Sequence, residues 1–261
     1  MDKQKIQQYG DKLYEALDTG DPIDPITDHE PSITIEDAYA IQLRMIERRL
    51  QERNEHIVGK KIGLTSKAVM NMLKVNEPDF GHLTSGMICG DGEAVALDSL
   101  IAPKAEGEIA FILKHDLEGP GVTAADVLRA TEYVLPCFEI VDSRVRDWKI
   151  KIQDTVADNA SSALFVLGDA AADPRQIDLS TVGMTLEKDG EPVLTGAGAA
   201  ALGHPANAVA WLANTLGRLG IGLSAGEVIL SGSLAAMVPI DAPCNLRITL
   251  GGIGSAGIRF V

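Results

Sequence analysis

The sequence changes character near residue 90, and this change most constrains the fold. The first third carries apolar residues at helical spacing, whereas the remainder consists mainly of short apolar runs separated by turns rich in Gly and Asp. The predicted helices are residues 3–17, 35–52, 122–133 and 204–220. Because strands and helices do not alternate regularly, we expect an α+β fold rather than a doubly wound sheet. We place the boundary near residue 90, with an amino-terminal α/β region at 1–90 that is smaller and mainly helical, and a larger domain at 91–261.

Strand-length apolar segments account for most of the larger domain and for one segment before it. The predicted strands are residues 56–63, 106–114, 133–143, 162–168, 184–196, 227–232, 246–252 and 254–261. Asp189-Gly190 predicts a hairpin turn inside the fifth of these. A short helix is expected at residues 67–73, with Ser66 as its cap, followed by a turn at 76–81.

The charge balance excludes several classes of partner. With 23 Lys and Arg against 37 Asp and Glu, the net charge is −14, which should repel nucleic acid and anionic membrane surfaces. An amino terminus without a secretory apolar core, and no run of about 20 apolar residues, predict a cytoplasmic protein. The three cysteines, Cys89, Cys137 and Cys244, show no CxxC spacing, so neither a disulfide framework nor a zinc site is indicated. A small anionic substrate would need a local cation.

Three glutamates in apolar strands are the first candidates for chemistry. Side chains alternate along a strand, so Glu106 and Glu108 should share one face while Gly107 faces the other way. Glu139 lies in a second apolar strand. Three carboxylates without a His or Cys companion suit Mg²⁺ or Mn²⁺ better than Zn²⁺. A solvated edge strand bearing surface glutamates is the alternative interpretation.

Paired lysines in GKKIGLTSKAV are candidates for the local cation. Lys60 and Lys61 should point to opposite faces of a strand, so only one of them can enter a pocket. A turn with two solvated lysines would explain the same letters.

Three polar segments supply further candidates. Ser161 lies in VADNASS, and Ser231 and Ser233 flank a glycine after an apolar run; all can donate to substrate oxygens, although plain turns explain them equally well. Asp79 in NEPDFG is expected in a turn outside the strands, as a candidate proton carrier.

Together, several motifs in order resemble the hydratase/decarboxylase branch of the fumarylacetoacetase superfamily over essentially the whole chain. These motifs are GKKIGLTSKAV, PDFG, PKAEGEIAF, CFEIVDSR, DWKIKIQDTVADNASS and GEVILSGSL. The resemblance implies a β-roll-like sheet domain packed against a smaller amino-terminal region, with the active site between them.

The resemblance also implies roles for the candidates. Glu106, Glu108 and Glu139 would ligate Mg²⁺ or Mn²⁺, and Lys61 matches the family's lysine. Ser161, with Ser231 and Ser233, would lie near the substrate carboxylate. The implied activity is addition of water to 2-hydroxypenta-2,4-dienoate, the enol form of 2-oxopent-4-enoate, to give 4-hydroxy-2-oxopentanoate in the meta-cleavage pathway of aromatic catabolism. Lys61 and Asp79 would stabilise charge and move protons, and homo-oligomers and a complex with 4-oxalocrotonate decarboxylase are implied as partners.

Four alternatives stay open. A 4-oxalocrotonate decarboxylase would use the same three glutamates, but the resemblance associates it with the loss of the PDFG aspartate and with a T-G-G-type turn in place of residues 231–233. A hydratase for the longer 2-oxohept-4-ene-1,7-dioate would need an extra basic group, which the sequence does not identify. A C–C hydrolase would need a water-activating His–Glu pair, and none is evident at a matching position. A non-catalytic partner of the decarboxylase would have no need of an acidic cluster.

Overall fold

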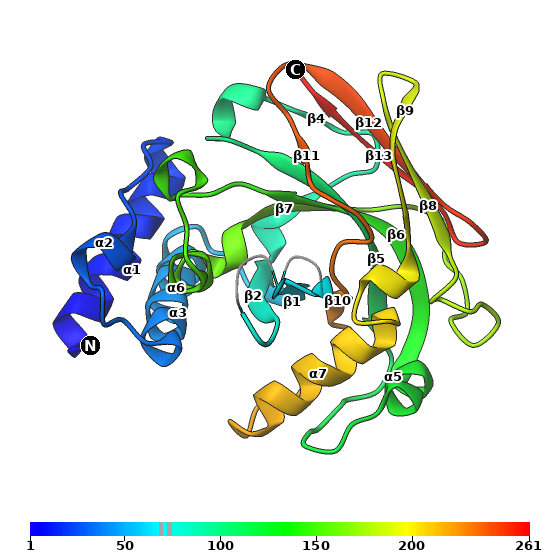
Figure 1. Ribbon diagram of the computed structural model, residues 1–261, viewed down its shortest axis with the longest axis horizontal. Coiled ribbons are helices and arrows are strands. Elements are labelled where there is room, and N and C mark those ends of the chain that lie inside the picture. The colour runs from blue at the N-terminus through cyan, green and yellow to red at the C-terminus, as the bar shows by residue number, and fades with distance from the viewer. Residues whose placement is uncertain (68–69, 72–74) are drawn as a thin grey trace.

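The computed structural model describes residues 1–67, 70–71 and 75–261. Its described part contains an eight-stranded sheet, a five-stranded sheet and a group of helices beside them (Figure 1). This arrangement confirms the α+β class. The short helix expected at residues 67–73 falls partly outside the described residues. No helix in the described ranges is long and apolar enough to cross a bilayer.

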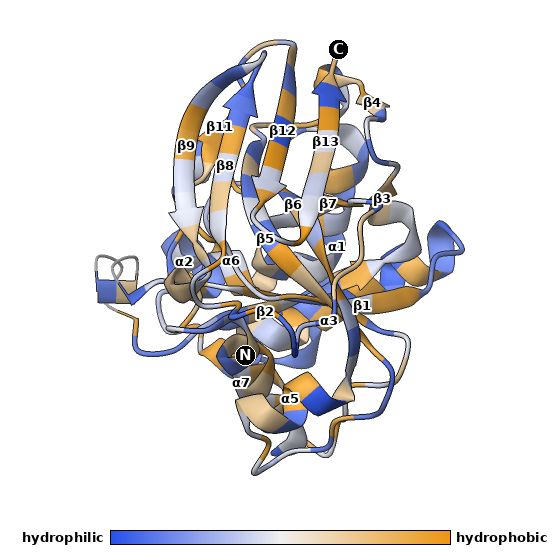
Figure 2. Ribbon diagram, turned by 90° about the vertical axis from the view of Figure 1, so that its right-hand side faces the viewer, coloured by the Kyte–Doolittle hydropathy of each residue, from blue (hydrophilic) through white to orange (hydrophobic). Residues whose placement is uncertain are grey.

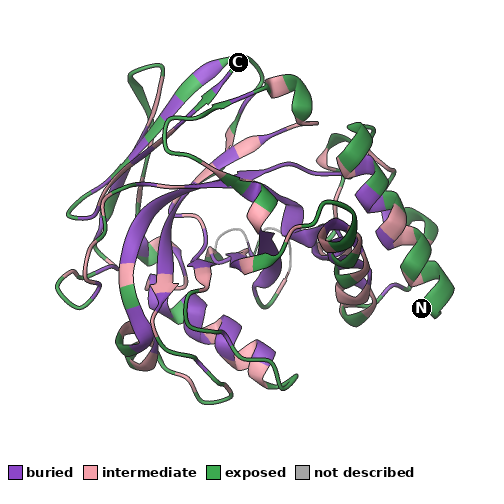
Figure 3. Ribbon diagram, turned by 180° about the vertical axis from the view of Figure 1, so that it is seen from behind, coloured by how far each residue is buried: buried purple, intermediate pink, exposed green. Residues whose placement is uncertain are grey.

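Helices α1 and α3 form an amino-terminal cluster with α2 and α6. The helices of the described chain are α1 (Lys3–Thr19), α2 (Ile26–His29), α3 (Ile35–Glu52), α5 (Ala124–Ala130), α6 (Ile152–Ala157) and α7 (Pro205–Gly217). Thr34 caps α3 in a reciprocal capping box with Asp37. The apolar faces of α1 and α3 pack on each other and on α6, while their outer faces are exposed (Figure 3).

The larger sheet brings together segments from both ends of the chain. Its strands are β1 (Ile57–Gly63), β2 (Asp79–Thr84), β3 (Ile88–Cys89), β5 (Lys104–Leu113), β6 (Thr131–Val141), β7 (Ser162–Leu167), β10 (Val228–Leu230) and β11 (Val238–Pro239). They lie in the order β2-β1-β10-β5-β6-β7-β3, with β11 beside β5. β1, which precedes residue 90, pairs in parallel with β10, which follows it, so hydrogen bonds of one sheet join the two expected domains. The domain boundary expected there stays a prediction.

The smaller sheet covers one face of the larger one. Its strands are β4 (Ala94–Val95), β8 (Gly183–Lys188), β9 (Glu191–Ala197), β12 (Cys244–Leu250) and β13 (Gly254–Phe260), in the order β4-β13-β12-β8-β9 (Figure 2). Buried and exposed residues alternate along β12, and its buried side joins the main core. The predicted hairpin at Asp189-Gly190 is confirmed, since these two residues join β8 and β9 with positive φ angles of 54° and 86°.

The helix expected over residues 122–133 is shorter than predicted. It ends at Ala130, and Thr131 already pairs with Leu113 as the first residue of β6. The sheet register therefore overrides the helical pattern at this end. β6 is consequently long enough to run beside the whole of β5.

Candidate metal centre

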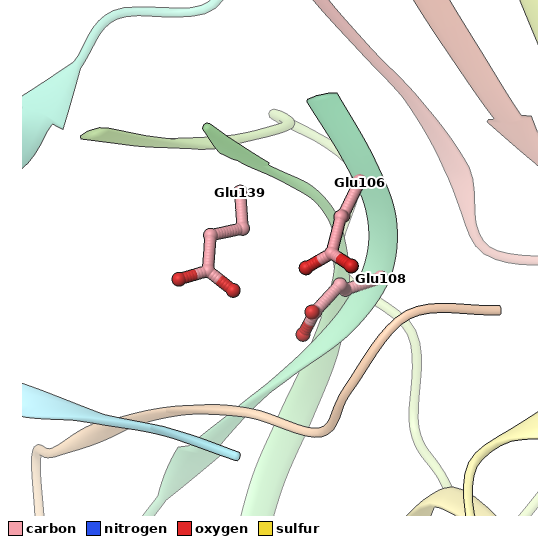
Figure 4. A group of neighbouring side chains, drawn as sticks. All are labelled: Glu106, Glu108 and Glu139. Carbon is pink, nitrogen blue, oxygen red and sulfur yellow. The ribbon is translucent and has the colours of Figure 1, made fainter. Parts of the chain in front are cut away.

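Glu106, Glu108 and Glu139 meet on one face of the larger sheet. Glu106 lies directly opposite Glu139 in the β5–β6 register, and Glu108 follows two residues along β5 on the same face. Each side chain offers an oxygen, and these oxygens all lie within 4.8 Å of one another (Figure 4). Ile109 and Phe111, from the alternate positions of β5, are in the core instead. The expected alternation along this strand is confirmed.

Burial of these carboxylates makes them costly as free anions. Glu108 and Glu139 are 0% exposed, and Oε1 of Glu108 and both oxygens of Glu139 have no hydrogen-bond partner. Burial, followed by the charge of Glu139, raises the pKa of Glu106 to about 7. The same two causes raise the pKa of Glu108 well above its usual value. The cluster therefore requires protons or a further cation.

Lys61 supplies one such cation from β1. It lies opposite Leu230 of β10, which in turn lies opposite Ala110 of β5, so its side chain stands on the glutamate face. Its Nζ is 3.2 Å from Oε2 of Glu139. Burial acts to lower the pKa of Lys61, but Glu139 and then Asp79 outweigh burial and raise it. This ammonium group is therefore held in its charged form.

Lys60 lies on the opposite side of the same strand. Its Nζ forms an ion pair of 2.6 Å with Glu227, away from the glutamate cluster. The prediction that only one of the two lysines enters the site is confirmed.

Asp79 lies in a strand, and the expectation of a turn was wrong. It is the first residue of β2 and pairs with Gly63, because the antiparallel ladder with β1 extends to this point. The turn signals of NEPDFG therefore end at Pro78. The Asp79 side chain is buried, Oδ1 has no hydrogen-bond partner, and burial raises its pKa although Lys61 opposes the shift. A Cβ built on Gly63 would lie 2.2 Å from Asp79 Oδ1 and 3.5 Å from Lys61 Nζ, so both groups flank this glycine.

The Ser231-Gly232-Ser233 turn contacts the cluster through its backbone. The Gly232 N–H donates to Oε2 of Glu108 at 2.8 Å. The hydroxyl of Ser231 donates to the carbonyl of Ile109, and that of Ser233 to the carbonyl of Ala235. Gly232 adopts a φ of +97°, and a Cβ there would lie 2.2 Å from Oγ1 of Thr65. The sequence singled out the two serines here, but not that the amide between them would bind a glutamate.

Ser161 lies in a strained turn between α6 and β7. Asn159, Ala160 and Ser161 all have positive φ angles, between 50° and 55°. Oγ of Ser161 lies 3.2 Å from Oγ1 of Thr155 and 3.4 Å from Oδ2 of Asp158. Within residues 1–67, 70–71 and 75–261, the Ser161 hydroxyl forms no hydrogen bond with the three glutamates. Its role in binding substrate stays a prediction.

A buried arginine holds this turn, and sequence reasoning missed it. Arg144 is 1% exposed, and its Nε donates to Oδ1 of Asp158 at 2.5 Å. Its Nη2 donates to the Asp158 carbonyl at 2.6 Å, and its Nη1 to the Ser162 carbonyl at 3.1 Å. The side chain of Asn159 exchanges two hydrogen bonds with the backbone of His82 in β2. The turn is thus fixed to the strand that begins with Asp79. In the sequence, the only signals for these contacts are the DSR and ADNASS motifs.

The arrangement can hold a hard divalent cation. All three groups of the cluster offer oxygen, and Lys61 provides one positive charge for them, so such an ion would supply the further charge that Glu108 Oε1 and Glu139 Oε1, buried without hydrogen-bond partners, require. Lys61 and Asp79 stand beside the cluster as a fixed cation and a carboxyl group with a raised pKa. Such a set can bind an anion and move protons next to it.

Comparisons with known proteins agree with this geometry. Residues 53–260 match the family model described as fumarylacetoacetate (FAA) hydrolase C-terminal. The chain is 56% identical over 262 residues to a 2-hydroxyhexa-2,4-dienoate hydratase of Comamonas testosteroni, covering 99% of this chain and 98% of that one. It is 63% identical over 222 residues to a 2-hydroxypent-2,4-dienoate hydratase of Pseudomonas putida, covering 85% and 100%. The structure of 4-oxalocrotonate decarboxylase from Pseudomonas putida G7, complexed with magnesium and adipate, superposes with a TM-score of 0.96 at 39% identity, covering 100% of this chain and 99% of that one. The resemblance seen in the sequence is confirmed: the chain belongs to the fumarylacetoacetate hydrolase family.

Proposed function

We propose that this chain is a metal-dependent hydro-lyase that adds water to 2-hydroxypenta-2,4-dienoate to give 4-hydroxy-2-oxopentanoate. The observation that carries the proposal is the cluster of three glutamates with Lys61 and Asp79 on the same face. Relatives named as hydratases of 2-hydroxydienoates, at 56% and 63% identity, support the substrate class.

The resident ion is Mg²⁺ or Mn²⁺, held by Glu106, Glu108 and Glu139. The all-oxygen donor set and the unpaired buried oxygens support this assignment. When bound, the ion supplies Lewis-acid polarisation of a 2-oxo acid and offsets the charge of its enolate. The Gly232 amide orients one of the carboxylates that hold it.

Lys61 and Asp79 act on the substrate directly. Protonation of the dienol at C5 gives a conjugated 2-oxo-3-enoate, whose C4 then accepts water. Lys61 stabilises negative charge at the end of the substrate that carries the carboxylate and the C2 oxygen. Asp79, whose raised pKa keeps a proton available, delivers and removes protons at the distal carbon and at the water. Ser161, with Ser231 and Ser233, lies near the substrate carboxylate and binds it.

A 4-oxalocrotonate decarboxylase is the second candidate, favoured by the close superposition on a decarboxylase structure. A hydratase and a decarboxylase both need a charge-stabilising site beside a 2-oxo acid, so the fold does not separate them. The higher identity to hydratases and the presence of Asp79 favour hydration.

An ultraviolet assay of the purified protein with Mg²⁺ or Mn²⁺ tests the two candidates. We expect 2-hydroxypenta-2,4-dienoate to disappear faster than 4-oxalocrotonate, with loss of turnover in Glu106→Gln while assembly is unchanged. Faster consumption of 4-oxalocrotonate with release of CO₂ would reject hydration. Full activity of Glu106→Gln would reject the role of the cluster.

We place the enzyme in the cytoplasm, in the meta-cleavage pathway of aromatic catabolism, as a homo-oligomer that forms a complex with 4-oxalocrotonate decarboxylase. Light scattering of the purified protein, alone and with the decarboxylase, measures both kinds of assembly. A monomeric mass, or no shift on mixing, would contradict the corresponding part.

A further inference from the structure

Lys104 is a cation fixed at one end of the glutamate cluster. Its Nζ lies 3.9 Å from the centroid of the Trp148 ring, in a cation–π contact. The indole Nε1 of Trp148 donates to the Ala102 carbonyl at 2.9 Å, which holds the ring in place. Among the described residues, Lys104 has no carboxylate within ion-pair distance, whereas Lys60 and Lys61 are both paired.

Lys104 stands on the same face of β5 as the cluster. It precedes Glu106 by two positions, so the alternation along the strand places both side chains on one side. Lys104 and Glu106 are partly exposed, while Glu108 is fully buried. The face therefore opens to solvent at the Lys104 end and closes toward Glu108.

A cation at this opening suits an anionic substrate. The chain carries a net charge of −14, which repels a small carboxylate until a local positive charge offsets it. Lys61 already neutralises Glu139 inside the site. The ammonium group of Lys104, by contrast, has N–H donors available for a ligand. The Trp148 ring holds this group without neutralising its charge.

We propose that Lys104, held over Trp148, is a specificity-determining residue that binds a substrate carboxylate at the open end of the site. This inference rests on the proposed function, which supplies the anionic substrate. The carboxylate has two possible sources: the single carboxylate of a 2-hydroxydienoate as it enters, or the distal carboxylate of a dicarboxylic analogue. In the second case, Lys104 would be the extra basic group that a longer dicarboxylic substrate requires.

Binding of two unreactive ligands separates these sources. Adipate and hexanoate have the same chain length but two carboxylates and one, respectively. Their dissociation constants are measured by calorimetry with the Mg²⁺-loaded protein and with Lys104→Met, Lys104→Arg and the control Lys149→Met. Lys149 is an exposed lysine paired with Asp147 in the loop of Trp148, so its loss removes the same charge without touching the site face.

We expect Lys104→Met to weaken ligand binding roughly tenfold or more, as for loss of a hydrogen bond to a charged group. Weakening confined to adipate assigns Lys104 to a distal carboxylate; weakening of both ligands assigns it to the entering carboxylate. Lys104→Arg should retain most of the affinity. No weakening beyond that of Lys149→Met for either ligand overturns the proposal.

Two readouts exclude a merely structural effect. Removing a positive charge beside the cluster should leave Mg²⁺ affinity unchanged or raise it, whereas disruption of β5 would lower it. Trp148→Phe should bind ligand like the wild type and Trp148→Leu more weakly, because only phenylalanine keeps the aromatic face. In turnover, Lys104→Met should raise KM with little change in kcat. Weaker Mg²⁺ binding in Lys104→Met, or equal ligand binding by Trp148→Phe and Trp148→Leu, contradicts the assignment.

The same experiment keeps this proposal separate from the proposed function. If the wild-type protein lacks hydratase activity but binds adipate or hexanoate in a way that depends on Lys104, the carboxylate site is supported and the hydratase function is rejected. If the wild type is an active hydratase but Lys104→Met leaves both KM and ligand affinity unaltered, the function is supported and the role of Lys104 is rejected.

Discussion

Lys61 and Glu139 form a buried ion pair with 3.2 Å between Nζ and Oε2, and their side chains are 4% and 0% exposed. The two residues come from strands separated by β10 and β5 in the sheet order. One ammonium group therefore faces the three carboxylates of the cluster, two of them fully buried, and the buried carboxyl group of Asp79. This imbalance is the main reason to assign a further cation to the cluster.

Replacing Lys61 by Met should abolish most turnover. The change removes the fixed positive charge beside the substrate and leaves Glu139 without its ion-pair partner, so we expect kcat to fall by about 10²- to 10³-fold, as on loss of a charge-stabilising donor. Steady-state kinetics measures this. Lys60→Met is the matched control, because Lys60 pairs with Glu227 on the other face and should keep near wild-type kcat. Equal losses in both variants would contradict the assignment.

The stabilising effect of Mg²⁺ should grow as the pH rises. Without metal, Glu106 in the folded state has a pKa of about 7, above its ordinary value of 4.5, so the folded protein binds more protons than the unfolded chain between these values. Its contribution to stability is therefore full below about pH 4.5 and is lost as the pH rises toward 7. Mg²⁺ binds the deprotonated carboxylates, so the rise in Tm on adding Mg²⁺ should grow over the same range.

Thermal melts at pH 5, 6, 7 and 8, with and without Mg²⁺, test this prediction. In Glu106→Gln, the increase of the Mg²⁺ effect between pH 5 and 7 should be smaller than in the wild type, because this variant no longer has the Glu106 proton to release. Glu132→Gln is the control, since Glu132 is exposed at the start of β6 and lies outside the cluster. A Mg²⁺ effect on the wild type that does not vary with pH would contradict the prediction.

Local patterns in the sequence predicted much of the fold and the site. The alternation of Glu106 and Glu108 against Gly107 and Ile109 required only strand periodicity, and the opposite orientation of Lys60 and Lys61 followed from the same rule. Helix caps such as Thr34 are also local signals. These features depend on neighbours within a few residues.

Long-range pairing could not be predicted in this way. Asp79 belongs to β2 because the ladder with β1 extends to Gly63, and turn-forming letters conceal that pairing. The Arg144–Asp158 pair and the link between Asn159 and His82 join segments up to 77 residues apart. Such contacts depend on tertiary packing, which overrides local propensity.

The absence of a side chain at Gly63 should be essential for the position of the Asp79 carboxyl group. In Gly63→Ala the new Cβ would lie 2.2 Å from Asp79 Oδ1, so the carboxyl group must move while every functional group is retained. We expect kcat to fall tenfold or more, since a displacement of about 1 Å can cost about 100-fold. Asp79→Asn should lower kcat further, with Mg²⁺ affinity retained in both variants. Gly183→Ala is the control because nothing lies within 4 Å of its Cβ; if its kcat matched that of Gly63→Ala, steric displacement of Asp79 would not be the cause.

The buried ion pair of Arg144 and Asp158 should stabilise the fold strongly. Arg144→Met leaves the Asp158 carboxylate buried at 0% exposure without its cation, and loss of one partner of such a pair costs about 3–5 kcal/mol of the free energy of unfolding. Urea denaturation monitored by circular dichroism measures the change. Arg175→Met is the matched control, because the Arg175–Asp173 pair is largely exposed to water and should contribute little to the free energy of unfolding. Arg144 also fixes the left-handed turn that carries Ser161, so Arg144→Lys should raise KM in the fraction of the variant that stays folded. If Arg144→Met changed the free energy of unfolding no more than Arg175→Met does, the turn would be held by other contacts.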